Sequence, residues 1–393
     1  MAEKERILFL YLPTGGGHIA AARALQREIT SSYSPDEVEL FLLDGLNPNS
    51  RVQRALVEQG YQFSTFTVPI LWPLIYQMSL IPWVMHVHTF AMVLYSTGHI
   101  RRFIREHKIT KVVNLHFLLT RPLYRALSQL KKRGMPSLTI VLDPFSCHPM
   151  WFFYQFMNMI VFSTRAWKEA KIDLFFYRKR GILTNLKKPK VMRYPPILNS
   201  RFNRAMDPGD IPAVKEHLGF TPHEPLVLIA GGGEGLPQGE EVLQELLQAR
   251  LPVQIAMVCG KNAHQKQRAE EIAGAYPDAR IRIFGFIDFM YELMNSADLV
   301  ITKAGPATIF ECLLLCKPVL LSQRLYGQEQ GNVSFVVRNG FGWFLPEPRD
   351  LVDQVRRIID NPEILEEATR RIRNRKLRNG TPEIARYIME SMK

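Results

Sequence analysis

The sequence contains little cysteine and has no cluster of metal-binding side chains. Its 393 residues include four cysteines, none in a CxxC pair, and Cys312 and Cys316 stand four residues apart in an apolar stretch without a nearby histidine. These features argue against a structural zinc site or a disulfide framework and favour a reducing cytosol. The apolar part of the amino-terminal segment is too short for a signal peptide, so we expect a first strand there.

Charge is absent from residues 59–100, a segment rich in aromatic and aliphatic side chains. A basic block follows at 101–133, where Glu106 is the single acidic residue. An uncharged aromatic segment beside cations is typical of an anchor on an anionic lipid surface. Two alternatives stay open: helices of an ordinary core, and a membrane span, against which three prolines, His86 and His88 argue. The candidate membrane-contacting residues are Trp72, Trp83, Arg101, Arg102 and Arg105.

The positive charge is confined to the first half of the chain. Residues 1–200 contain 26 Lys and Arg against 12 Asp and Glu, a net +14, whereas residues 201–393 contain 24 against 25, a net −1. Such asymmetry predicts an anionic partner for one half, either nucleic acid or acidic lipid. The basic block carries no nucleic-acid-reading motif and its aromatics form an apolar run, so we expect lipid and no nucleic acid.

Short apolar runs alternate with helical patterns in both halves, which predicts an α/β fold with two Rossmann-like, doubly wound domains facing a central cleft. The basic, proline-rich segment 187–196 is the expected linker. We expect domains at 1–197 and 198–360, and a helix at 361–393 that packs back on the first domain. The expected strands are 6–12, 38–43, 111–115, 138–142, 159–163, 226–230, 253–259, 281–284, 299–301 and 319–321, with helices at 20–29, 239–248 and 308–315.

Two glycine-rich turns, at 15–18 and 231–235, each follow an expected strand and precede an expected helix. Glycine lets a ligand approach the backbone closely, and a helix amino terminus favours phosphate. Neither turn matches the dinucleotide or P-loop pattern, so a nicotinamide cofactor is not supported. A tight turn without a ligand is the alternative, but the recurrence of the turn at equivalent places favours ligand binding.

The segment 302–311 has the features of a nucleotide site. A Gly-Pro turn exposes backbone amides, and we expect Thr308 to begin a helix whose first turn binds a diphosphate. Glu311 suits the two hydroxyls of a ribose, or else forms a capping box with Thr308. Further along, the polar group at 327–332 offers an amide and a carboxylate for sugar hydroxyls.

These motifs together resemble the monogalactosyldiacylglycerol synthase family, which includes processive diacylglycerol glucosyltransferases. The resemblance covers most of the chain in the same order and implies a GT-B fold, a UDP-sugar donor, a diacylglycerol acceptor, inversion at the anomeric carbon and no catalytic metal or other cofactor. It also implies a peripheral enzyme at the cytoplasmic face of a membrane. The motifs are GGGH at 15–18, LDPFSCHPMWF at 142–152, LIAGGGEG at 228–235, VCGKN at 258–262, the run 285–311 and YGQEQGN at 326–332.

The resemblance also implies roles for individual residues. His18, Asp143 and His148 lie at the acceptor, and either His18 or Asp143 is the general base. Gly16 and Gly17 lie near the acceptor and the departing UDP. The donor-binding residues are Gly231, Gly232, Gly233, Gly260, Phe286, Lys303, Ala304, Gly305, Pro306, Ala307, Thr308, Glu311, Gln328, Glu329 and Asn332.

The sequence departs from the family pattern on the acceptor side. Pro144 replaces the usual leucine after Asp143, and Phe153 replaces the usual histidine after Phe152. The donor sugar stays open among galactose, glucose and N-acetylglucosamine, as does the lipid. A UDP-sugar epimerase and a non-catalytic lipid- or nucleotide-binding protein are the alternatives; the uncharged segment argues against the first and the intact polar residues against the second.

Overall fold

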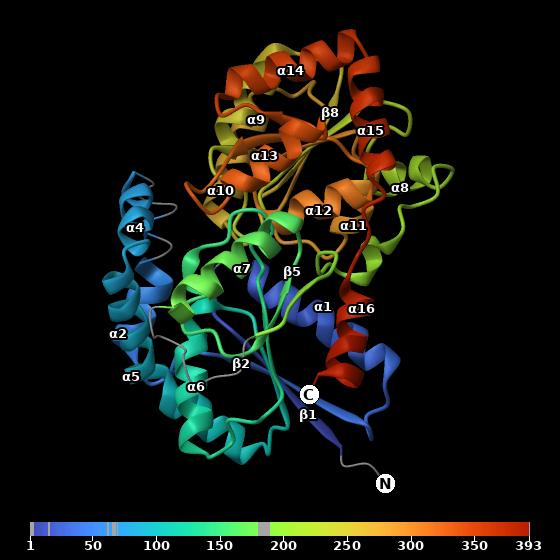
Figure 1. Ribbon diagram of the computed structural model, residues 1–393. Coiled ribbons are helices and arrows are strands. Elements are labelled where there is room, and N and C mark those ends of the chain that lie inside the picture. The colour runs from blue at the N-terminus through green and yellow to red at the C-terminus, as the bar shows by residue number, and fades with distance from the viewer. Residues whose placement is uncertain are drawn as a thin grey trace. The chain divides into compact units, whose positions relative to one another are not determined.

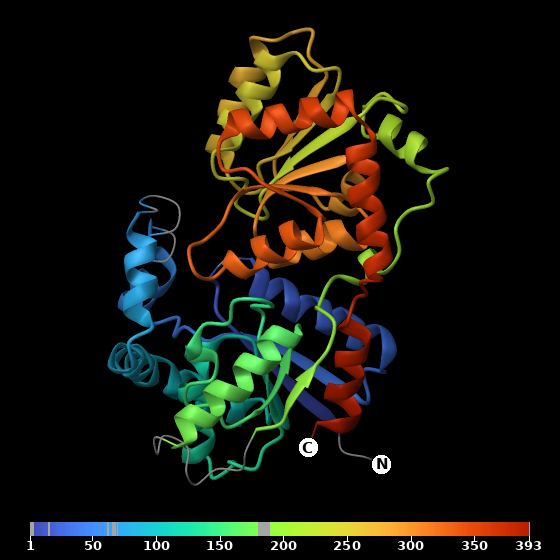
Figure 2. The ribbon, with the colours of Figure 1, turned by 45° about the horizontal axis from the view of Figure 1, so that its top comes forward.

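The computed structural model describes residues 4–14, 16–60, 63–64, 68, 70–179 and 189–392. The chain divides into two compact units, each shown in Figures 1 and 2. The first contains Met1–Ser200, Tyr326–Gln328 and Gly380–Lys393, and the second contains Arg201–Leu325 and Glu329–Asn379.

The first unit is built on a parallel sheet whose strand order is β2-β1-β3-β4-β5-β6. Because the chain leaves β1 for β2 on one side and β3 lies on the other, the strand order reverses between β1 and β3. Open α/β sheets bind ligands at such a reversal, outside the carboxyl ends of the strands. The strands are β1 (Glu5–Tyr11), β2 (Val38–Asp44), β3 (Lys111–Asn114), β4 (Ser137–Ile140), β5 (Asn158–Val161) and β6 (Val191–Arg193).

Helices cover both faces of this sheet. Ile7 and Phe9 face a core shared with α1 and α16, whereas Leu8 and Leu10 face a core shared with α5 and α6, as the two-residue period of a strand requires. Figure 1 shows α1 and α16 close together on one face. The helices are α1 (Gly17–Ser32), α2 (Arg51–Arg54), α4 (Leu71–Ser79), α5 (Pro82–Glu106), α6 (Thr120–Gln129), α7 (Thr164–Lys179) and α16 (Thr381–Arg386), with π-helices at Ala55–Gln59 and Tyr387–Ser391 and 3-10 turns at Phe117–Leu119 and Pro149–Trp151.

The second unit repeats the architecture with the strand order β12-β11-β10-β7-β8-β9, all parallel. Here the order reverses between β7 and β10, so the turns that follow these two strands lie at the expected ligand-binding edge. The strands are β7 (Leu226–Ala230), β8 (Gln254–Val258), β9 (Ile281–Phe284), β10 (Leu299–Lys303), β11 (Val319–Gln323) and β12 (Gly342–Phe344).

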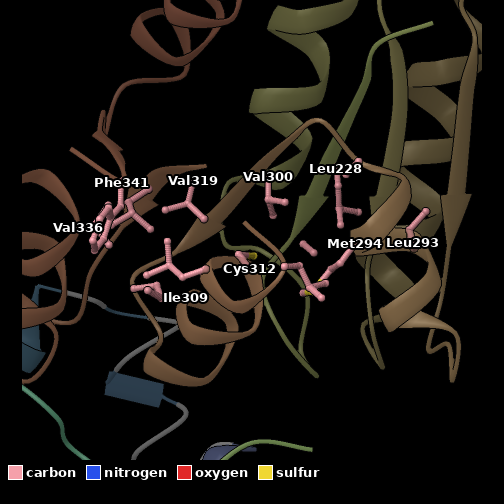
Figure 3. Close-up of a cluster of buried hydrophobic side chains, with 14 of the residues drawn as sticks. Leu228, Leu293, Met294, Val300, Ile309, Cys312, Val319, Val336 and Phe341 are labelled. Atoms are coloured by element: carbon pink, nitrogen blue, oxygen red, sulfur yellow. The ribbon is translucent and has the colours of Figure 1, made fainter. Parts of the chain in front are cut away.

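One face of the second sheet packs on α11, α12 and α13, as Figure 3 shows for Leu228, Val300 and Val319 against Ile309 and Val336. The other face packs on α9 and α14. The helices are α8 (Ile211–His217), α9 (Gly239–Ala249), α10 (Ala263–Gly274), α11 (Met290–Ser296), α12 (Pro306–Leu314), α13 (Gln330–Asn339), α14 (Pro348–Asp360) and α15 (Glu363–Arg375), and Ser200–Asn203 forms a 3-10 turn.

The structure confirms the expected α/β class with two parallel sheets, and it corrects several local predictions. Helix α12 begins at Pro306 instead of Thr308, with Gly305 at its amino terminus and no side-chain cap, so the capping box of Thr308 with Glu311 is not formed. The expected linker contributes the edge strand β6, while its residues 187–188 lie outside the described residues, as does Gly15 of the first glycine turn. The long charged helical stretch near the carboxyl end is divided into α15, α16 and a π-helix.

Candidate active site

His18 lies at the strand-order reversal of the first sheet, in the first turn of α1. Its Nδ1 is 2.8 Å from the carbonyl oxygen of Leu115, at the end of β3. Since a carbonyl only accepts, Nδ1 carries the proton and the lone pair of His18 is on Nε2. Burial lowers the pKa of His18 to about 4, although the bond to Leu115 opposes the shift. The ring is therefore neutral near pH 7 and has an unprotonated nitrogen, as a general base requires.

His116, which the sequence analysis did not single out, holds the turn that precedes His18. The backbone N–H of Leu118 donates to Nδ1 of His116 at 3.2 Å, so Nε2 carries the proton and donates to the Thr14 hydroxyl at 3.1 Å. The rings of His116 and His18 lie 4.7 Å apart. Burial lowers the pKa of His116 well below its usual value, so two neutral imidazoles stand side by side.

Gly16 and Gly17 are exposed at the amino terminus of α1. A Cβ added to either glycine would meet no atom within 4 Å, and neither has a positive φ, so the fold itself does not require glycine there. The first turn of α1 contains no acidic residue and has no side-chain cap. Its free N–H groups are therefore available to an anionic group that approaches the backbone closely.

Asp143 and His148 belong to the loop after β4, and both are engaged within the first unit. The Trp151 indole donates to Oδ2 of Asp143 at 2.6 Å. Nδ1 of His148 accepts from the N–H of Met150 at 3.1 Å, so its Nε2 carries the proton, 2.9 Å from the Ser79 hydroxyl. Burial lowers the pKa of His148 to about 4. Both ring nitrogens of His148 therefore form hydrogen bonds, and the bond to Ser79 connects the loop to α4.

Gln328, predicted to bind the donor sugar, groups with the first unit together with Tyr326 and Gly327. Its side-chain amide donates to Oδ1 of Asp143 at 3.3 Å. The Asp143 carboxylate thus accepts from two side chains in the structure.

The glycine turn of the second unit, at 231–235, is hydrogen-bonded to the loop that follows β8. Gly232, Gly235 and Gly260 have positive φ, and the N–H of Lys261 donates to the Gly233 carbonyl at 2.8 Å. A Cβ on Gly260 would clash with that same carbonyl oxygen. This loop pair therefore requires glycine for packing, unlike Gly16 and Gly17.

Alanine at Gly17, which has open space around it, and alanine at Gly260, which packs against backbone, are expected to change stability differently. Gly17→Ala is expected to leave the free energy of unfolding unchanged or raised by about 0.5 kcal/mol, and to lower turnover because the added methyl blocks close approach of substrate. Gly260→Ala is expected to lower the free energy of unfolding by about 2 kcal/mol or more. Thermal unfolding and turnover measure both effects, with Gly274→Ala, which meets no atom within 4 Å, as the control. A destabilised Gly17→Ala variant would show that its glycine serves the fold.

Helix α12 begins directly after β10, on the reversal side of the second sheet. Gly305 is its amino-terminal cap and Pro306 its first residue, and the first turn contains no acidic side chain. By contrast, Glu240 and Glu241 occupy the first turn of α9, which follows the glycine turn. An anion is thus favoured at α12 over α9.

Glu311 projects from the second turn of α12 and is partly buried. Burial raises its carboxyl pKa to about 7. Among the residues that the structure describes, none donates a hydrogen bond to this carboxylate, so its oxygens can both accept from ligand hydroxyls.

Glu329 and Asn332 lie where α13 begins, with their side chains buried. The N–H of Leu325 donates to Oε2 of Glu329 at 2.7 Å, and burial raises the pKa of Glu329 while nearby Lys303 opposes that shift. Asn332 donates to the Ala304 carbonyl at 2.9 Å, and its own buried Oδ1 has no partner in the described chain. These contacts hold the start of α13 against the end of β10. Phe286, just beyond β9, is 69% exposed.

The uncharged segment forms α4 and α5, which expose much of their apolar surface. Trp83 is 64% exposed, whereas Trp72 is half-buried and its indole donates to the Tyr326 carbonyl. Arg101, Arg102 and Arg105 are exposed near the end of α5. Phe66 and Pro69 of this segment lie outside the described residues. The exposed apolar residues of α4, α5 and the loops beside them are Ile70, Leu71, Leu74, Ile75, Met78, Ile81, Trp83, Val87, Phe90, Leu94 and Tyr95.

None of the described helices is, by itself, long and apolar enough to cross a membrane. Leu71–Ser79 and Pro82–Glu106 meet the length and composition criteria only as a pair, and they are bent by 95° at their junction. In the described ranges, no three His, Cys, Asp or Glu side chains are grouped so that they could hold a metal ion. Independence from metal stays a prediction.

Two parallel sheets, each with a glycine turn at its strand-order reversal, define a GT-B glycosyltransferase fold. Over 98% of the chain, the structure resembles MurG from Acinetobacter baumannii (99% of that chain) with a TM-score of 0.61 and 15% identity. The model of the monogalactosyldiacylglycerol (MGDG) synthase family matches residues 18–173, and that of the glycosyltransferase family 28 C-terminal domain matches 226–384.

Curated relatives agree with both models. A probable monogalactosyldiacylglycerol synthase 2 of Oryza sativa subsp. japonica is 29% identical over 91% of this chain and 74% of its own length. Monogalactosyldiacylglycerol synthase of Spinacia oleracea is 27% identical over 89% of this chain and 65% of its own length. The first half of the chain thus matches the monogalactosyldiacylglycerol synthase family and the second half glycosyltransferase family 28, and the chain is a UDP-sugar-dependent hexosyltransferase. The family and enzyme class predicted from the motifs are confirmed.

Proposed function

We propose that the protein transfers one hexose from a UDP-sugar to the free hydroxyl of diacylglycerol, with inversion at the anomeric carbon. The observation that carries this proposal is the neutral His18 at the reversal of the first sheet, whose protonated nitrogen is held by Leu115 and whose other ring nitrogen accepts no hydrogen bond from the described residues. The names of the relatives, synthases of monogalactosyldiacylglycerol, support diacylglycerol as the acceptor and galactose as the hexose.

In the proposed reaction, Nε2 of His18 removes the proton from the lipid hydroxyl as its oxygen attacks the anomeric carbon. The new carbon–oxygen bond forms as the bond to the diphosphate breaks, and UDP leaves with the bonding electron pair. Free N–H groups at the amino terminus of α12 stabilise the negative charge that develops on the diphosphate. Attack from the side opposite the leaving group inverts the configuration of that carbon.

We assign the general base to His18 instead of Asp143. Asp143 accepts hydrogen bonds from Trp151 and Gln328, one on each carboxylate oxygen, so both oxygens are already engaged within the first unit. Asp143 and His148 then shape the acceptor loop. On the donor side, Glu311 binds the ribose, Glu329 binds hydroxyls of the sugar, and the turn from Lys303 to Thr308 holds the diphosphate. Phe286 lies beside the uracil, and Gly231, Gly232, Gly233 and Gly260 allow the nucleotide to approach.

We further propose that α4 and α5 dock the enzyme on an anionic membrane surface, as a peripheral protein at a cytoplasmic face. Their exposed apolar side chains enter the headgroup region, while the cations at the end of α5 attract acidic lipids. This arrangement brings the enzyme to an acceptor that is confined to the bilayer.

Charge reversal tests this docking surface. The triple variant Arg101→Glu, Arg102→Glu and Arg105→Glu is expected to weaken binding to phosphatidylglycerol vesicles by more than about a hundredfold, since each cation contributes about 1 kcal/mol, and to leave UDP affinity unchanged. Vesicle flotation and UDP titration measure the two quantities. Reversal of the exposed Arg373, Arg375 and Lys376 of the second unit is the control. Equal losses in both triple variants would mean that net charge alone attracts the protein.

Turnover with defined substrates tests the proposed reaction. UDP-galactose, UDP-glucose and UDP-N-acetylglucosamine are offered separately with diacylglycerol in anionic vesicles, with and without EDTA. We expect a hexosyl lipid from UDP-galactose, at the same rate in EDTA. A product formed only from UDP-N-acetylglucosamine, or an epimerised UDP-sugar without a lipid product, would replace this proposal with the corresponding alternative.

A further inference from the structure

Helix α7 has a second exposed apolar surface, separate from α4 and α5. Ile172 and Phe175 are each 66% exposed and Phe176 is 43% exposed. Their spacing of three and four residues places them on one side of the helix. The opposite side of the helix packs against the rest of the unit. Its buried residues are Ala166, Ala170, Leu174 and Tyr177. Ile172 and Phe175 lie outside this buried cluster, whereas the Phe176 ring contacts that of Tyr177 at its edge, with ring centres 5.6 Å apart.

The charges on the exposed side of α7 are basic. Between residues 164 and 177, the exposed charged side chains are Arg165, Lys168 and Lys171, whereas the acidic Glu169 and Asp173 are half-buried. Arg165 is paired with Glu169 at 2.8 Å, so Lys168 and Lys171 supply the net positive charge of this side. Exposed aromatic side chains next to cations complement the interface of an anionic bilayer, where apolar groups enter and cations meet lipid headgroups.

The buried cluster beneath α7 continues to the start of α5. Met85 of α5 packs in the same cluster as Leu174 of α7. The Phe153 ring lies between His86 of α5 and Tyr177 of α7, with ring-centre distances of 4.7 and 5.2 Å. The first turn of α5 and the last turns of α7 therefore flank one cluster.

Exposed apolar residues also stand next to this cluster on α5. Trp83 and Val87, which stand on either side of Met85 and His86 along α5, are 64% and 55% exposed. Figures 1 and 2 both show the carboxyl end of α7 directed toward the side of the unit on which α5 lies.

We propose that the exposed face of α7, formed by Ile172, Phe175 and Phe176, is a second membrane contact that binds the same anionic bilayer as α4 and α5. This inference rests on the membrane docking proposed above. One contact region leaves the unit free to rotate on the surface, whereas two contacts on separate helices fix its orientation. The glycine turn and His18 then keep a constant orientation to the bilayer that contains the acceptor.

Vesicle binding of the double variant Ile172→Glu and Phe175→Glu tests this contact. We expect a fall of about tenfold or more in partitioning onto phosphatidylglycerol vesicles, because two apolar groups that enter the interface are replaced by charges that acidic lipids repel. Val337→Glu, at a residue of the second unit that is 46% exposed, is the matched control. Circular dichroism and UDP titration show that each variant is folded. If the folded α7 variant partitions like the wild type, the proposal is overturned.

A measurement on a less disruptive variant separates this inference from the docking of α5. An environment-sensitive fluorophore is attached at Phe175→Cys, Val87→Cys or Val337→Cys, and labelled wild type corrects for the four native thiols. With brominated lipids, we expect quenching at positions 175 and 87 and none at 337. Quenching at 87 alone overturns the α7 contact and retains the α5 contact, whereas quenching at neither position overturns both. A lipid-independent change at 175 that tracks dimer formation in sedimentation would assign the face to a second copy.

Discussion

Replacement of His18 by glutamine is expected to lower kcat by about 10² to 10⁴-fold, the usual contribution of a general base. Glutamine keeps a donor that can reach the Leu115 carbonyl but offers no nitrogen that can take a proton at neutral pH. The fold and UDP binding should persist, because the bond from His18 to Leu115 is the hydrogen bond that its side chain makes among the described residues. Steady-state kinetics with vesicle-borne acceptor measures the effect.

The control for this prediction is His99→Gln, since Nε2 of His99 also bonds a backbone carbonyl, that of Asp44, at 3.1 Å. His99→Gln should leave kcat nearly unchanged. The pH profile adds an independent test: because the pKa of His18 is lowered to about 4, the base stays deprotonated, and kcat at saturating donor should not fall as pH decreases through 6.5. Full activity in His18→Gln would transfer the role of base to Asp143.

Replacement of Glu311 by glutamine is expected to raise the Kd for UDP about 10- to 100-fold, because hydrogen bonds to a charged group contribute about 1.5–3 kcal/mol. Glutamine preserves the shape of the side chain and removes its charge. Isothermal titration with UDP measures the change, and Glu363→Gln, at an exposed position of α15, is the control. Unchanged affinity would remove Glu311 from the ribose site.

The pH dependence of UDP binding should distinguish Glu311 from a merely structural carboxylate. Burial raises its pKa to about 7, so the carboxylate is ionised above pH 7 and becomes protonated as pH falls. Since ribose hydroxyls donate to the ionised form, wild-type affinity should weaken about tenfold for each pH unit below 7. Glu311→Gln should lose this dependence between pH 5 and 7, whereas Glu363→Gln should retain it.

The two sheets could be predicted from the sequence because each buried strand is an apolar run followed by a turn. The three-residue edge strands β6 and β12 were missed, since so short a segment carries almost no period-two signal. The start of α12 was placed two residues late, because Thr308 has the chemistry of a cap whereas the chain begins the helix at Pro306, a residue suited to the first helical position.

The candidate site could be proposed from the sequence only in part, because several of its contacts join residues that are distant in sequence. His18 belongs to a motif, but its tautomer depends on Leu115, which is 97 residues away. His116 carries no local signal, because a lone histidine after a strand is common in sequences. The contact of its ring with His18 appears only when β1 and β3 pair. The apolar face of α7 was likewise hidden by the charged residues interspersed along that helix.

The anomeric configuration of the lipid product tests the central claim most directly. The enzyme is incubated with α-linked UDP-galactose and diacylglycerol in anionic vesicles, and the coupling constant of the anomeric proton is read from the NMR spectrum of the purified glycolipid. A single displacement assisted by His18 predicts a β-linked monohexosyl lipid and its loss in His18→Gln. An α-linked product, or UDP release without any glycolipid, would contradict the account.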